Sequence, residues 1–214
     1  MTDSIKNYKK LFFDKKYDEI ISQIENNKEQ RSAKILHILG ICKVIKGYHN
    51  KDIKLSAREN FREAYLLEKN TDLGVEALSN FINLNSDFLE IKDSIDYFNQ
   101  LDDKYKNNIN ILKAISRVYQ FSFQVKKRKE IIEKILNFNP SSSKDWCSYI
   151  YIQNFNYSWD QEKFFKQSRK MSNIIPNFNL DKLSLDKNIK ENKIKIGFIS
   201  SDLVDRHSVS YFLK

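Results

Sequence analysis

The sequence contains very little glycine and proline, with 4 and 2 residues among 214. All-β folds and open α/β folds need many tight turns, and such turns depend heavily on these two residue types. Their scarcity argues against both fold classes over most of the chain. It favours long helices joined by short polar connections, in a chain whose 41% hydrophobic and 30% charged residues are typical of a globular protein.

Cysteine is scarce as well. Cys42 and Cys147 lie far apart and show neither a metal-ligand nor a redox spacing, so we expect both to be reduced and buried. The chain also lacks a signal-peptide-like apolar run after Met1 and any stretch of about 18 apolar residues that would span a membrane. We therefore predict a soluble, cytoplasmic protein with no membrane partner, no metal and no cofactor of its own.

The net charge of +9 raises the question of an acidic partner. The densest basic run, Lys-Lys-Arg-Lys at residues 126–129, falls where a helix should begin, against the sense of the helix dipole. Two interpretations stay open: a solvated turn, or a docking patch for an acidic partner. Aromatic residues are not interleaved with basic ones as a base-stacking platform requires, so nucleic-acid binding is the weakest of the functions considered.

Apolar residues recur at helical spacing from about residue 3 to residue 172. Ile111, Ile115 and Val118 share one predicted helix face, with Leu112 and Tyr119 beside them. Helix-start patterns recur too, in which a short polar side chain caps the first free amides. The predicted starts are Ser142 with Asp145, Ser158 with Gln161 and, more weakly, Asp87 with Glu90.

The predicted helices come in pairs, and the second helix of each pair looks alike, at residues 16–21, 57–64, 94–98 and 129–140. A spacing of about 35 to 40 residues is typical of helix-pair solenoids. Gly40 is predicted to let the paired helix approach, against a ridge of Ala57, Phe61 and Ala64, and residues 48–55 are interpreted as an insertion between the two helices. The pattern resembles a degenerate tetratricopeptide repeat (TPR). Such a solenoid either binds peptides on its concave surface or packs against a neighbouring domain.

The character of the chain changes after residue 174. Residues 176–192 form a predicted linker, and residues 194–199 alternate apolar with small or polar side chains as a β-strand does. The strand ends in a turn at Ser200, Ser201 and Asp202, and residues 208–213 are predicted to start a helix. This order is typical of the opening of a Rossmann-like unit, in which ligands bind beyond the carboxyl ends of strands.

Residues 193–214, KIKIGFISSDLVDRHSVSYFLK, resemble the start of the catalytic region in the O-GlcNAc transferase/SPINDLY family. The stretch from Phe155 to Ser158 and the predicted helix 159–171 resemble the element that joins repeats to catalytic domain in bacterial members. The resemblance implies a metal-independent inverting glycosyltransferase with helical repeats in front, which transfers a sugar from UDP-GlcNAc to Ser or Thr hydroxyls of proteins. The lobe that makes most nucleotide contacts in the family would follow Lys214.

The resemblance also implies site residues. His207 matches the histidine of the family's active-site cleft, where it is either a base or a binder of the acceptor or phosphate. Ser200, Ser201 and Asp202 are candidate substrate-binding residues, although Asp202 also fits a helix N-cap and the two serines also fit a simple turn. His37, in a repeat helix, and His49, in a polar connection, are assigned no role.

The sequence thus predicts a mostly α-helical chain in four parts: TPR-like repeats at 1–140, connecting helices at 141–175, a linker at 176–192 and an incomplete catalytic domain at 193–214. The leading hypothesis is the N-terminal part of a protein O-glycosyltransferase, inactive as this chain alone. The alternative is a stand-alone TPR-like adaptor that binds proteins through its repeats.

Overall fold

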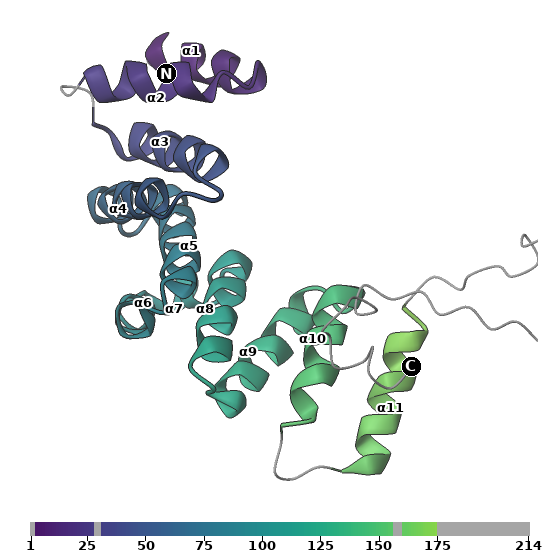
Figure 1. Ribbon diagram of the computed structural model, residues 1–214. Helices are drawn as coiled ribbons and strands as arrows, with labels where there is room; N and C mark the ends of the chain where they lie inside the picture. Colours follow the sequence, from purple (N-terminus) through teal and green to yellow (C-terminus); the bar gives the residue numbers. More distant parts are fainter. Residues whose placement is uncertain (1–2, 28–30, 156–159, 175–214) are drawn as a thin grey trace, which may run out of the picture. The chain divides into compact units, whose positions relative to one another are not determined.

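The computed structural model describes residues 3–27, 31–155 and 160–174, shown as coloured ribbon in Figure 1. The chain divides into two units, Met1–Pro176 and Asn177–Lys214, and every described residue lies in the first. Within the described residues there are eleven helices and no β-strand. The helices are α1 (Asp3–Phe13), α2 (Tyr17–Asn26), α3 (Ala33–Lys46), α4 (Lys51–Leu67), α5 (Asp72–Asp87), α6 (Ile91–Asn99), α7 (Asp103–Lys106), α8 (Ile109–Phe121), α9 (Val125–Phe138), α10 (Ser143–Gln153) and α11 (Gln161–Ser172).

The helices form successive pairs, and each pair packs on the next. The pairs are α1–α2, α3–α4, α5–α6, α8–α9 and α10–α11, with the single-turn helix α7 inserted before α8. Beyond its own partner, α5 packs against α4 and α8, and α3 also reaches α5. Figure 1 shows this order from α1 to α11. The prediction of paired helices is confirmed. The segments predicted as second helices at 57–64 and 94–98 lie within α4 and α6, and those at 16–21 and 129–140 overlap α2 and α9.

Three clusters of buried apolar side chains hold the described helices together. The largest runs from α3 to α9 and contains Ile111, Ile115 and Val118, each with 0% of its surface exposed. The face predicted from helical spacing is therefore the buried face of α8. Two smaller clusters join α1 and α2 to α3, and α9 to α10 and α11. Apolar burial that continues from one pair to the next is the usual source of stability in a helical-repeat protein.

The helix starts agree with the sequence prediction at one of three places. The Ser142 hydroxyl accepts a hydrogen bond from the Asp145 amide at 3.3 Å, as predicted. For α11 the capping side chain is Asp160, which accepts from the Lys163 amide at 3.0 Å, rather than the predicted Ser158. The third prediction is wrong, because Asp87 is the last residue of α5. Its carboxylate binds Arg117 instead of capping a new helix.

The predicted insertion at residues 48–55 is wrong. Only residues 47–50 separate α3 from α4, because the Asn50 side chain accepts hydrogen bonds from the amides of Asp52 and Ile53 and starts α4 at once. The extra residues lengthen α4 to 17 residues. A capping asparagine after a glycine resembles a loop in sequence, although here it begins a helix.

The two cysteines differ in environment. Cys42 is buried in α3, as predicted, whereas Cys147 is exposed on α10, so the prediction for Cys147 is wrong. In the run at 126–129, Lys126 and Lys127 are exposed in the first turn of α9, but Arg128 is half-buried. Burial lowers the pKa of Arg128 from its ordinary value, so this run is not fully solvated.

No helix among the described residues combines the length and apolar character needed to cross a membrane. The predicted connecting helix at 159–171 is observed as α11. The predicted linker at 176–192, the strand at 194–199 and the helix start at 208–213 lie outside the described residues, so the Rossmann-like part of the fold stays a prediction.

Candidate functional site

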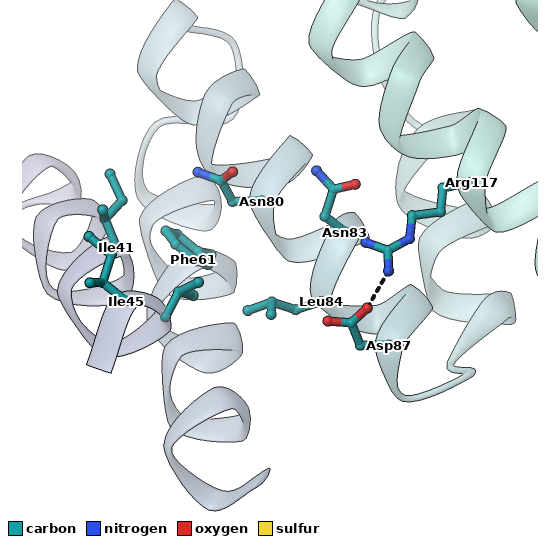
Figure 2. A pocket seen from close by; sticks show the side chains of 9 residues that line it. Ile41, Ile45, Phe61, Asn80, Asn83, Leu84, Asp87 and Arg117 are labelled. Atoms are coloured by element: carbon teal, nitrogen blue, oxygen red, sulfur yellow. Dashed lines mark hydrogen bonds and ion pairs between the residues drawn. The ribbon is translucent and has the colours of Figure 1, made fainter. Parts of the chain in front are cut away.

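A groove of about 440 Å³ lies over α3, α4, α5 and α8. Figure 2 shows it from close by, with side chains from all four helices turned toward the same space. Its lining residues are Ile41, Val44, Ile45, Phe61, Asn80, Asn83, Leu84, Asp87 and Arg117. This volume falls within the usual range of about 300 to 1,000 Å³ for ligand-binding clefts.

The floor of the groove is apolar. Ile41 and Ile45 are one helical turn apart on α3, and Leu84 faces them from α5. The Phe61 ring comes from α4 and reaches the groove because Gly40 on α3 leaves room for it: a Cβ on Gly40 would lie 2.6 Å from Phe61 Cε1. The predicted close approach at Gly40 is thereby confirmed, and it delivers an aromatic ring to the floor.

Polar side chains line the α5 side of the groove. Asn80, Asn83 and Asp87 follow one another at spacings of three and four residues, which places them along one face of α5. Asn80 Nδ2 lies 3.0 Å from His37 Nε2. The Asn83 side chain forms no hydrogen bond with another described residue, and its amide donors and acceptor are therefore free for a ligand.

One end of the groove is marked by an ion pair. Arg117 on α8 donates from Nη2 to Asp87 Oδ1 at 2.5 Å, the contact drawn as a dashed line in Figure 2. Lys54 on α4 approaches the other oxygen of the same carboxylate at 3.7 Å. Asp87 is thus shared by cations from two helices, which fixes the ends of α5 and α8 relative to each other.

His37 lies behind the groove rather than in it. Only 6% of its surface is exposed, and its ring packs on Phe61 with the centroids 5.5 Å apart. Burial lowers the pKa of His37 below its ordinary value of 6.5, against the opposing charge of Glu76. The neutral ring is therefore favoured, and its Nε2 can accept the hydrogen bond that the Asn80 amide donates. His37, which was assigned no role from the sequence, therefore holds the Asn80 side chain in place.

The site residues predicted from the sequence are not part of this groove. Ser200, Ser201, Asp202 and His207 all lie outside the described residues, and their roles stay predictions. The groove itself was not predicted, although one signal was present: Asn80, Asn83 and Asp87 interrupt the apolar pattern of α5 at helical spacing. Nowhere in the described ranges do three or more His, Cys, Asp or Glu side chains gather as a metal site.

Stacked helix pairs, each packed on the next, define a TPR-like helical-repeat protein. Two of the solved structures that match this chain illustrate the shared fold. MamA 41-end from Desulfovibrio magneticus RS-1 superposes with a TM-score of 0.64 at 14% identity, and the MamA RS-1 ArsTM double mutant does so with 0.65 at 13%. Each match covers 81% of this chain and 96% of that chain.

At such low identity, the likeness to MamA shows the fold alone. No protein-family model matches the chain, and no curated protein matches it. The TPR-like architecture is established, whereas neither MamA structure bears on the resemblance to the O-GlcNAc transferase/SPINDLY family, which rests on residues 193–214.

Proposed function

We propose that this chain is an adaptor that binds another protein by holding an extended peptide segment in the groove over α3, α5 and α8. The observation that carries the proposal is the unpaired Asn83 amide beside an apolar floor. An extended peptide presents backbone N–H and C=O groups that need partners, and a carboxamide offers both a donor and an acceptor. The floor of Ile41, Ile45 and Leu84 is suited to one apolar side chain of the same peptide.

The rigidity of the groove supports this role. Asn80 is held by His37, and Asp87 is held by Arg117, so two of the polar side chains are already ordered before a ligand arrives. Pre-ordered side chains lower the entropy that binding must overcome. Because Asp87 and Arg117 neutralise each other, the groove selects for backbone geometry and apolar content more than for peptide charge.

The test is selection of peptides from a random library on the full chain, followed by affinity measurement by fluorescence anisotropy. Asn83→Ala removes the free amide, and we expect it to weaken the selected peptides about tenfold, the effect of one lost hydrogen bond. The matched control is Asn99→Ala, an exposed asparagine at the end of α6, away from the groove. Failure to select any peptide, or equal loss in both variants, would contradict the proposal.

A second candidate function depends on residues 193–214. Their resemblance to the O-GlcNAc transferase/SPINDLY family supports the chain being the N-terminal part of a protein O-glycosyltransferase, with the repeats presenting the acceptor protein and His207 in the cleft. The test is sugar transfer from labelled UDP-GlcNAc, together with the melting temperature with and without UDP. We expect no transfer and no shift from this chain alone. Measurable turnover would contradict that expectation, and a reading frame that ends at Lys214 would favour the adaptor.

A further inference from the structure

The turns that join the two helices of each of the first four pairs share a surface pattern. We call them the pair turns: residues 14–16, 47–50, 88–90 and 122–124. At or beside each pair turn one large apolar side chain projects into solvent, with exposed fractions of 90% for Phe13, 70% for Tyr48, 66% for Leu89 and 87% for Phe123. Three residues after each of them stands an exposed lysine: Lys16, Lys51, Lys92 and Lys126.

Two of the apolar residues occupy backbone positions that do not suit them. Leu89 and Phe123 have φ angles of 60° and 55°, in the left-handed region that glycine and asparagine adopt most easily. A bulky residue there costs stability, and such strain is more often found where it serves a function. Neither side chain is buried, so packing within the fold does not explain why positions 89 and 123 carry apolar residues.

The lysines are also unfavourably placed. Each lies at the N-cap or within the first two positions of the following helix, where a positive charge opposes the helix dipole. Lys16 forms an ion pair with Glu19 at 3.7 Å, but among the described residues none is seen for Lys51, Lys92 or Lys126. We call the four exposed apolar side chains, Phe13, Tyr48, Leu89 and Phe123, the apolar tips. The same unfavourable pairing of an apolar tip with a lysine occurs at all four pair turns.

Contacts tie consecutive pair turns together. Lys46, just before the second turn, binds Asp18, just after the first, at 2.7 Å. The second and third turns contribute Tyr48 and Leu89 to the walls of one hollow of about 590 Å³. The ion pair between Asp87 and Arg117 joins the ends of α5 and α8, from which the third and fourth turns leave. Each turn is therefore held beside the next.

We propose that the pair turns form a surface that docks on an anionic lipid bilayer. Tyr48 and Leu89 line one hollow, but Phe13 and Phe123 do not line it, so the four tips together do not form the continuous groove that a peptide needs. Base stacking is also disfavoured, because Leu89 has no ring and the aromatic tips are not consecutive. Separate apolar tips beside lysines suit a flat, deformable surface: the tips enter the interface and the lysines meet the headgroups.

Acidic residues at the turns offset only part of this charge. Glu90 is bound by Arg58, and Asp87 by Lys54 and Arg117. Exposed Asp14, Asp52 and Asp93 lie next to lysines in the first three turns, whereas the fourth turn leads into the basic run at 126–129. The prediction of no membrane partner was based only on the lack of an apolar run long enough to cross a bilayer. Docking on the surface needs no such run.

The experiment is co-sedimentation of the full chain with vesicles of phosphatidylcholine alone or with about 30 mol% phosphatidylglycerol. We expect binding to the anionic vesicles only, weakening as salt rises. The variant K16Q/K51Q/K92Q/K126Q should bind at least about tenfold more weakly, since each lysine near the surface contributes to attraction. The matched control K69Q/K113Q/K134Q/K163Q removes the same charge from exposed lysines outside the pair turns and should keep most of the binding.

A second variant tests the apolar tips. F13S/Y48S/L89N/F123N keeps every charge, and asparagine suits the left-handed backbone at 89 and 123, so the variant should fold and lose binding to the same extent. Three results would overturn the proposal: no sedimentation of the wild type with anionic vesicles, equal loss in the control lysine variant, or tight binding to polyglutamate or single-stranded DNA that the vesicles do not compete with.

Discussion

Gly40 on α3 lies directly against the ring of Phe61 on α4: an added Cβ would stand 2.6, 2.8 and 2.9 Å from three ring carbons. Both residues are buried, and Phe61 is among the largest fully buried side chains of the described residues. The ring cannot move aside without disturbing the largest apolar cluster, to which it belongs. This contact sets how closely the two helices approach each other.

Gly40→Ala should therefore destabilise the protein. Alanine is the better helix former by about 1 kcal/mol, but overpacking a buried ring costs about 1–3 kcal/mol, and we expect the clash to prevail. The measurement is the free energy of unfolding in urea. A double-mutant cycle with Phe61→Leu should show coupling of at least about 0.5 kcal/mol, because the smaller side chain relieves the clash. Additive effects of the two substitutions would show that the helices adjust independently.

Asn85 on α5 offers a stabilising substitution. Its surface is 0% exposed, and neither its side-chain nitrogen nor its oxygen has a hydrogen-bond partner among the described residues. An unpaired buried amide costs about 1–3 kcal/mol, so Asn85→Leu should raise the stability by about 1 kcal/mol and the melting temperature by about 2–4 °C. The exposed Asn99→Leu serves as the control and should change neither. A loss of stability at Asn85 would indicate that ordered water satisfies the amide.

The buried His37 should make stability depend on pH. Because burial lowers its folded-state pKa below 6.5, the unfolded chain binds a proton first as the pH falls. Stability contributed by the neutral ring is present above pH 6.5 and declines as the pH drops toward the folded-state pKa. His37→Gln should flatten the change in melting temperature between about pH 7.5 and 5.5. Equal slopes for wild type and His37→Gln would contradict the assignment.

The two thiols should react at very different rates. Burial raises the pKa of Cys42 to about 11 and shields it, whereas Cys147 is exposed on α10. A thiol-specific reagent such as dithionitrobenzoate should modify one cysteine of the native chain and both after denaturation. In Cys147→Ser the native chain should be unreactive. Rapid modification of that variant would mean that α3 opens readily.

The sequence predicted the helix pairs well because their pattern is local. Ile111, Ile115 and Val118 recur at the helical period, which predicts a helix with one buried face. Gly40 is conspicuous within an apolar helix, which predicts a close approach of the paired helix. The ends of the helices were harder to predict from the sequence. Asn50 and Asp87 each suit either a helix cap or a loop, and only the groups that they contact in the folded chain decide which role they take. The groove could not be assembled from one segment, because Ile41, Asn83 and Arg117 meet only when three helices pack.

The carboxylate of Asp87 borders both the groove and the hollow between the second and third pair turns. A ligand that binds Arg117 in the groove would compete with Asp87 for that cation, and a ligand that binds Lys54 in the hollow would compete for the second cation of the same carboxylate. Where binding at one place changes the affinity of the other, thermodynamic reciprocity makes the effect equal in both directions. Asp87 is therefore the side chain through which the groove and the pair turns can influence each other.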